Sequence, residues 1–207
     1  MENQEGLSLF FLIFKGGVIM IPIGLLSILS IYFIIERFIY INNAYKLEAN
    51  FMNNMKDLLG KGDIKAAKAY CQRLNSPISR VIEKGVNRIG KPIKDIESAM
   101  ESAAGLELDK VEKNMSFLGL TAGIAPMLGF IGTIGGIIKI FYDIAQSNNV
   151  SIDVIAGGLY VKMITSGAGL VVGVLAYTGY HFLNSRIDRF NHKMQATAVD
   201  FIDVLES

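Results

Sequence analysis

Three long stretches of this sequence contain no charged residue. They cover residues 16–35, 114–138 and 163–185. About 20 apolar residues in a helix span the ~30 Å hydrocarbon core of a bilayer, and a helix satisfies its own backbone hydrogen bonds there. The sequence therefore predicts an all-α integral membrane protein with three transmembrane helices.

Lysine and arginine are distributed unevenly around these stretches. The segment 37–113 holds 14 of them, whereas the segment 142–153 holds none. Loops rich in Lys and Arg stay on the cytoplasmic side of a membrane. We therefore expect the segment 37–113 and the C-terminus in the cytoplasm, with the N-terminus and the short acidic loop on the opposite side.

These patterns predict seven consecutive segments. They are a periplasmic or interfacial N-terminal segment 1–14, a first transmembrane helix 15–40, a cytoplasmic helical domain 41–114, a second transmembrane helix 115–142, a periplasmic loop 143–153, a third transmembrane helix 154–185 and a cytoplasmic C-terminal helix 186–207.

The cytoplasmic segment has the helical spacing of apolar residues throughout. Asp63 is expected to cap a short helix over 64–74, and Ser76 precedes a proline that starts another helix ending at Gly90. From Pro92 onward no residue interrupts the pattern before the membrane, which predicts one helix from Pro92 to about Tyr142, roughly 75 Å long. Two of the three membrane helices, the second and the third, are thus expected to extend into a cytoplasmic helical bundle.

The composition excludes several classes of function. A net charge of +1 gives no reason to expect nucleic-acid binding. One cysteine and two histidines cannot form a Cys/His zinc site, so no metal is expected. No cofactor motif is present, and no catalytic triad or paired carboxylate lies near the membrane, so an enzyme is the least favoured class.

Small residues are concentrated in the second and third uncharged stretches. The positions expected to mediate helix packing are Gly129, Gly132, Gly136, Gly169 and Gly173. Small residues mark places where helix backbones approach each other in lipid. Two interpretations remain, packing within one subunit or packing of repeated subunits around an axis. Pro22 and Pro126 are expected to be structural kinks.

A few hydroxyl groups interrupt these apolar stretches. Thr133 lies midway along the second, and Thr165 and Ser166 lie in the third. A helix hydroxyl often bonds only to its own i−4 carbonyl. The alternative is that hydroxyls on adjoining glycine-rich helices line a hydrated ion pathway facing a partner.

Lys162 is the most unusual charge in the sequence. It lies nine residues past Asp153, about 13 Å along a helix axis. Its long side chain can snorkel to the outer head groups. Alternatively, it faces an interior cavity one turn from Ser166 and pairs with a carboxylate of another subunit.

The three stretches resemble the membrane segments of one family. GGVIMIPIGLLSILSIYFIIERF resembles the first span of ExbB and TolQ proteins. IAPMLGFIGTIGGII resembles the second-span signature A-P-x-L-G-L-L-G-T-V-x-G of the MotA/TolQ/ExbB proton-channel family, and ITSGAGLVVGVLAY resembles its third span. The resemblance covers nearly the whole chain, and the length is similar to that of ExbB.

The resemblance implies a five-fold ring of such subunits in the inner membrane of a Gram-negative bacterium. The ring would enclose two copies of an ExbD-like single-span partner that carries an intramembrane aspartate. Proton flow would power a TonB-like energy transducer for outer-membrane import, or envelope integrity in TolQ-like systems. Thr133 and Ser166 fall on the family's second-span and third-span hydroxyls.

One position departs from the family pattern. Many ExbB and TolQ proteins place a glutamate five residues before the third-span hydroxyl, where this chain has Val161. Either the hydroxyls and the partner's aspartate suffice here, or this subunit conducts differently. A non-conducting scaffold that only holds a partner helix is the second hypothesis.

Overall fold

The structure is a computed structural model that describes residues 17–48, 50–147 and 152–206. Every regular element in these ranges is an α-helix, which confirms the predicted all-α class. The chain divides into two compact units. The first comprises Met1–Ile35 and Asn114–His181, and the second comprises Glu36–Lys113 and Phe182–Ser207.

Among the described residues, three helices are long and apolar enough to cross a membrane, as the uncharged stretches predict. They are α2 (Met20–Ala44), α7 (Met115–Ser147) and α8 (Ile152–Glu206). Helix α7 belongs wholly to the first unit, whereas α2 and α8 supply residues to both units. The predicted N-terminal segment 1–14 lies outside the described residues.

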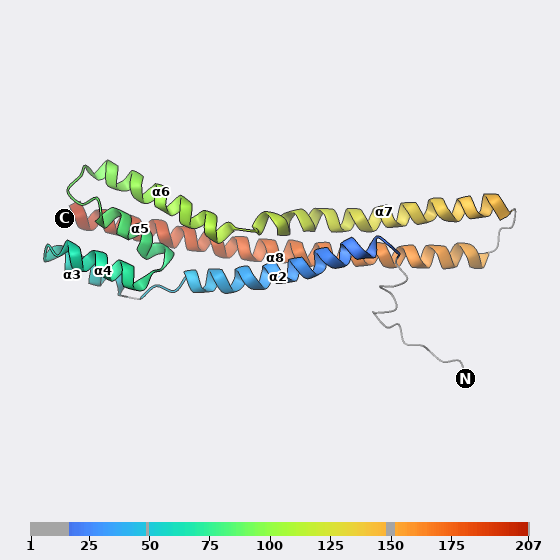
Figure 1. Ribbon diagram of the computed structural model, residues 1–207, viewed down its shortest axis with the longest axis horizontal. Helices are drawn as coiled ribbons and strands as arrows, with labels where there is room; N and C mark the ends of the chain where they lie inside the picture. The colour runs from blue at the N-terminus through green and yellow to red at the C-terminus, as the bar shows by residue number, and fades with distance from the viewer. Residues whose placement is uncertain (1–16, 49, 148–151, 207) are drawn as a thin grey trace, which may run out of the picture. The chain divides into compact units, whose positions relative to one another are not determined.

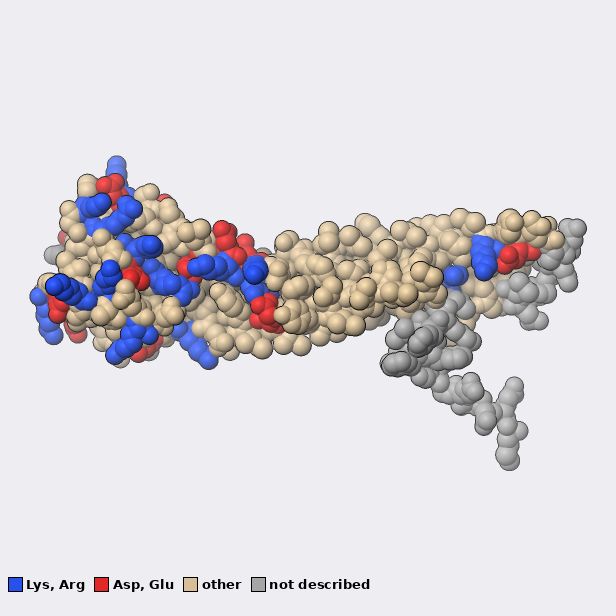
Figure 2. All heavy atoms as spheres, in the orientation of Figure 1, with Lys and Arg blue, Asp and Glu red and all other residues tan. Residues whose placement is uncertain are grey.

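In the first unit, α2, α7 and the first part of α8 pack against one another (Figure 1). Ile23, Ala125 and Val172 contribute one residue from each helix to a buried cluster. The outward side chains are large and apolar, and Figure 2 shows a broad uncharged surface over these helices. Such a surface suits contact with lipid chains.

The second unit contains four further helices. They are α3 (Phe51–Gly60), α4 (Ile64–Leu74), α5 (Pro77–Val86) and α6 (Ile93–Glu112). The Asp63 side chain accepts a hydrogen bond from the backbone N–H of Ala66 at 2.9 Å, which confirms the predicted cap of α4. Figure 2 shows the charged residues gathered over this unit.

Helix α5 begins at the predicted place and ends earlier than expected. Ser76 and Ser79 form a reciprocal capping box around Pro77, with bonds of 3.1 and 2.9 Å. The helix ends at Val86 rather than at Gly90. Turn-type bonds then carry the chain to Gly90, whose φ of +93° suits glycine.

The core of the second unit forms where α5 meets α6 and the last part of α8. A Cβ atom on Gly85 would lie 2.6 Å from both the Met100 sulfur and the Phe201 ring. Because no side chain intervenes, these three helices pack closely around Gly85. Val81 and Phe190 are fully buried in the same unit.

The single helix predicted from Pro92 to Tyr142 is wrong, because the chain breaks between α6 and α7. Helix α6 ends at Glu112, and α7 begins at Met115. Asn114 has a φ of +65°, in the left-handed region that asparagine tolerates better than most residues. The sequence contains no glycine or proline at this point, so the pattern gave no signal for the break.

Arg37 stabilises the end of α6. Its guanidinium, almost fully buried, donates to the carbonyl oxygen of Lys110 at 2.9 Å and to that of Val111 at 3.5 Å. The last carbonyls of a helix lack partners within the helix and carry partial negative charge. Glu36 pairs with the same guanidinium, which also lies 4.7 Å from the centre of the Tyr40 ring.

The connection between α7 and α8 is shorter than the predicted loop 143–153. Helix α7 continues to Ser147, and α8 starts at Ile152. Residues 143–147 contain no helix-breaking residue, which accounts for the extra turn.

Candidate functional site

Helices α7 and α8 approach closely in the first unit because glycines face each other. A Cβ atom on Gly169 would lie 2.5 Å from the carbonyl oxygen of Ala125 and 3.0 Å from the Gly129 Cα. A Cβ on Gly173 would meet the Pro126 ring at 2.5 Å. These glycines therefore allow backbone-to-backbone contact within a single chain.

The contact between α7 and α8 extends further along α7, in the direction of Ser147. A Cβ atom on Gly132 would lie 2.8 Å from the methyl carbon of Thr165, and one on Gly136 would collide with the side chain of Lys162. Five glycines singled out from the sequence thus lie at the α7–α8 contact inside one subunit.

Thr133 forms the polar contact between the two helices. Its Oγ1 donates to the Gly129 carbonyl oxygen at 3.2 Å, the i−4 bond of its own helix, and lies 3.1 Å from the Lys162 carbonyl oxygen of α8. A hydroxyl carries one proton, so the two carbonyls share it. The oxygen lone pairs of Thr133 remain able to accept a hydrogen bond.

Thr165 and Ser166 occupy different environments although they are adjacent. Thr165 is fully buried against Gly132. Ser166 is half-buried and lines an apolar groove, and its side chain forms no hydrogen bond within the part of the chain that the structure describes. A serine hydroxyl in that position can both donate and accept.

The groove beside Ser166 runs between α7 and α8. Its volume is about 430 Å³, and it is lined by Pro126, Met127, Phe130, Ile131, Ser166 and Leu170. Met127 and Phe130 are 64% and 62% exposed. The single polar group in the lining is the Ser166 hydroxyl, so the groove offers an apolar helix a place to pack and one hydrogen-bonding group.

Lys162 lies across the face of α7 rather than projecting freely. Its aliphatic carbons cover Gly136, and the residue is half-buried. Its backbone carbonyl, not its ammonium, contacts Thr133. Snorkelling of Lys162 and its pairing with a carboxylate of another subunit both stay predictions.

Pro22 and Pro126 both lie inside helices. Pro22 falls in the first turn of α2, where a missing N–H costs little, and Pro126 falls in the interior of α7 and packs against Gly173. Val161, the position where the family often has glutamate, is part of α8, and its side chain lies outside the described residues.

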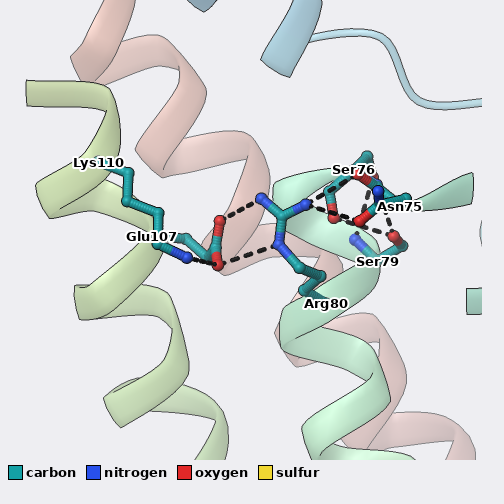
Figure 3. A network of polar contacts seen from close by, with 6 residues as sticks. All are labelled: Asn75, Ser76, Ser79, Arg80, Glu107 and Lys110. Atoms are coloured by element: carbon teal, nitrogen blue, oxygen red, sulfur yellow. Dashed lines mark hydrogen bonds and ion pairs between the residues drawn. The ribbon is translucent and has the colours of Figure 1, made fainter. Parts of the chain in front are cut away.

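A buried carboxylate in the second unit has no counterpart among the sequence predictions. Glu107 of α6 accepts from Arg80 of α5, with one bond of 3.0 Å, and from Lys110 at 2.7 Å (Figure 3). Arg80 also donates to the Asn75 carbonyl oxygen at 2.8 Å. The signal that identifies Glu107 is its place on the buried face of α6, between Met100 and Val111.

The charge of this carboxylate depends on competing effects. Burial opposes ionisation, but the hydrogen bonds from Arg80 and Lys110 outweigh it and hold the pKa of Glu107 below its usual value. The ionised network therefore ties α5 to α6 at neutral pH.

Comparison with known proteins identifies one family. The model of the MotA/TolQ/ExbB proton channel family matches residues 73–196. A putative biopolymer transport protein ExbB homolog of Methanothermobacter thermautotrophicus is 26% identical over 175 residues, which are 84% of this chain and 62% of that protein. This chain thus spans less than two thirds of that relative's length.

Two bacterial relatives extend the comparison. The biopolymer transport protein ExbB of Neisseria meningitidis is 24% identical over 190 residues, covering 85% of each chain. The Tol-Pal system protein TolQ of Haemophilus influenzae is 27% identical over 96 residues, which are 46% of this chain and 42% of that protein.

Proposed function

The chain belongs to the MotA/TolQ/ExbB proton channel family, and from this premise we propose that it is an ExbB-like subunit of a proton-driven motor in the inner membrane. Its family and its three apolar helices agree on a membrane location. In this proposal the N-terminus is periplasmic and the C-terminus cytoplasmic, following the distribution of Lys and Arg.

The observation that carries the proposal is the hydrogen bond from Thr133 of α7 to the Lys162 carbonyl of α8, one helical turn before Ser166 in the sequence. Thr133 keeps free lone pairs because its proton serves two carbonyls. It can therefore accept a hydrogen bond from a protonated carboxyl of a partner helix. The Ser166 hydroxyl can donate to the same carboxyl once it is ionised.

The two hydroxyls would then serve the two protonation states of one carboxylic acid: Thr133 accepts a hydrogen bond from the protonated form, and Ser166 donates one to the ionised form. Bringing an ionised carboxylate into an apolar span is costly unless donors receive it. We assign the carboxyl to an ExbD-like single-span partner, present as a dimer inside a pentameric ring of this chain. Under this assignment the chain needs no carboxylate of its own at Val161.

The driven machine is proposed from the relatives. ExbB proteins of Neisseria are named for biopolymer transport, which supports a TonB-like energy transducer as the downstream partner. The TolQ relative supports a second candidate, in which the same motor maintains the envelope. A non-conducting scaffold is the alternative from a different class, favoured by the missing glutamate.

Deletion of the gene in its own organism separates the first two candidates. Under the main proposal the deletion strain loses growth on iron–siderophore complexes as the iron source and keeps its resistance to detergents. Detergent sensitivity with normal siderophore uptake would favour the TolQ-like role instead. If the motor depends on the Thr133 hydroxyl, a plasmid carrying Thr133→Val should fail to restore growth of the deletion strain. If the chain is only a scaffold, the same variant should restore growth.

A further inference from the structure

A pocket in the second unit lies where α2 and α8 leave the apolar stretches. It is lined by Ile41, Asn42, Tyr45, Arg186 and Arg189 and has a volume of about 240 Å³. One water molecule takes up about 30 Å³ of liquid, so the pocket has room for a small polar group with its hydration. Arg186 is the first charge after the uncharged stretch 163–185.

Two layers of aromatic contacts flank the pocket along both helices. On the side of the apolar stretches, the exposed rings of Phe38 and Phe182 stack 6.3 Å apart. On the other side, the Tyr45 and Phe190 rings also lie 6.3 Å apart. The helices run in the same direction, so the two arginines lie between these layers, one turn beyond the membrane-facing rings.

The cations around the pocket are held in place without a carboxylate. The Arg186 guanidinium lies 4.8 Å from the Phe38 ring centre and 5.1 Å from that of Phe182. Arg189 Nε donates to the Ser185 carbonyl oxygen at 3.2 Å. Lys193 lies 4.5 Å from the Tyr45 ring centre. In the ranges covered by the structure, no ion pair involves Arg186, Arg189 or Lys193.

The pocket therefore presents positive charge and hydrogen-bond donors that form no ion pair with a carboxylate among the described residues. Arginine guanidinium groups bind phosphate oxygens through paired N–H donors. Tyrosine is enriched at membrane interfaces, and the exposed Tyr45 lines this pocket. A bound phospholipid would place its acyl chains along Phe38 and Phe182. Its phosphate group would then lie between Arg186 and Arg189.

We propose that this pocket binds the phosphate group of an anionic phospholipid at the cytoplasmic surface of the membrane. Arg186 and Arg189 receive the phosphate, and Asn42 and Tyr45 complete the polar rim. The site is separate from the α7–α8 contact that holds Thr133 and Ser166, and it would exist whether or not the chain conducts ions.

Native mass spectrometry of the full chain, purified in detergent in its native assembly, tests the proposal. The protein is titrated with phosphatidylglycerol or with phosphatidylcholine of the same acyl chains. We expect phosphatidylglycerol adducts to form selectively. Each arginine near a membrane surface contributes about fivefold in affinity, so Arg186→Gln and Arg189→Gln should each weaken binding about fivefold, and the double variant roughly 25-fold.

Matched variants keep the test independent of folding. Arg186→Lys retains the charge and should bind within about twofold of wild type. Lys94→Gln removes an exposed charge from α6, away from the pocket, and should leave the affinity unchanged. Equal affinity of wild type and the double variant would overturn the proposal, as would equal binding of the two lipids.

A soluble phosphate site is a distinct outcome of the same experiment. Inorganic phosphate or glycerol phosphate, added at the concentration of the lipid, should not displace phosphatidylglycerol. If either displaces the lipid fully at equal concentration, the pocket recognises free phosphate, and the assignment to a membrane lipid is wrong.

Discussion

The hydroxyl oxygen of Thr133 lies 3.1 Å from the backbone carbonyl oxygen of Lys162, so a side chain of α7 bonds to the backbone of α8. The contact requires the two helices to approach closely, which the glycines at their interface permit. The position of the one shared proton then leaves Thr133 as an acceptor toward any partner. Packing and chemistry at this point depend on the same few small residues.

Close packing of α7 on α8 predicts a strong effect of adding one methyl group. Gly169→Ala would push a Cβ atom against the backbone of Ala125 and Gly129, which cannot move away as a flexible side chain can. Overpacking of this kind costs about 1–3 kcal/mol. The thermal midpoint of the detergent-solubilised protein should fall.

Gly167→Ala is the matched control for that variant. Gly167 lies on the same helix, and a Cβ atom there meets nothing within 4 Å in the chain. Its thermal midpoint should stay at or slightly above the wild-type value, since alanine favours helix. Equal losses in both variants would contradict the packing described for Gly169.

The break between α6 and α7 predicts opposite effects of two substitutions at Asn114. Its φ of +65° is accessible to glycine without strain, whereas a β-branched side chain there costs about 1–2 kcal/mol. Asn114→Gly should keep the thermal midpoint, and Asn114→Val should lower it. A continuous helix would give the reverse order, because glycine weakens a helix interior.

The Arg80–Glu107–Lys110 network predicts acid sensitivity of the second unit. The pKa of Glu107 is lowered in the folded protein from its usual value of 4.5. Its stabilisation is therefore fully present above about pH 4.5 and disappears as the pH falls through the lowered pKa. The hydrogen-exchange protection factors of α5 and α6, which correct for the slower intrinsic exchange in acid, should fall at acidic pH, and much less so in Glu107→Gln.

Breaking the network at Arg80 should cost more than removing the carboxylate. Arg80→Ala leaves a nearly buried negative charge with only Lys110 as a partner, which we expect to cost about 2–4 kcal/mol. Glu107→Gln leaves cations that are at least a third exposed and should cost about 1–2 kcal/mol. The opposite order in hydrogen-exchange stability would show that Glu107 is not buried in solution.

The rate at which the buried Cys71 thiol is labelled measures how often the second unit opens. Burial raises the pKa of its thiol to about 12, with a smaller contribution from Glu83. At pH 8 only about one thiol in 10⁴ is ionised, so maleimide labelling should be very slow until the unit opens. The control is Ala69→Cys combined with Cys71→Ala, an exposed thiol on the same helix, which should react at once.

Much of the fold could be predicted because its signals are local. The lack of charge identified the three membrane helices, and Asp63 and Ser76 identified the starts of α4 and α5. The break at Asn114 could not be predicted, because a left-handed asparagine has no distinct local pattern. Arg37, which binds the Lys110 carbonyl near the end of α6, is 73 residues away from it in sequence.

The candidate site was only partly predictable. The sequence indicated that Thr133 could bond to its own helix or face a pathway, and it does bond to its own helix while also contacting α8. Thr165 and Ser166 could not be separated by sequence alone, since only the packing against Gly132 shows which of them is buried. Glu107 and Arg37 were missed because each binds a group far away in sequence: Glu107 binds Arg80, 27 residues away, and Arg37 binds the Lys110 carbonyl, 73 residues away.

Proton flux is the decisive measurement, made on this chain copurified with the proposed ExbD-like single-span protein and reconstituted in liposomes under a potassium-diffusion potential. Thr133→Val removes the hydroxyl and keeps the shape. The matched control is Thr121→Val on the same helix, where the hydroxyl bonds only to the Phe117 carbonyl oxygen at 2.9 Å. We expect the flux to fall about tenfold or more in Thr133→Val and to stay near wild type in Thr121→Val. Undiminished flux through Thr133→Val would contradict the proposal, as would the absence of any flux through the wild-type complex.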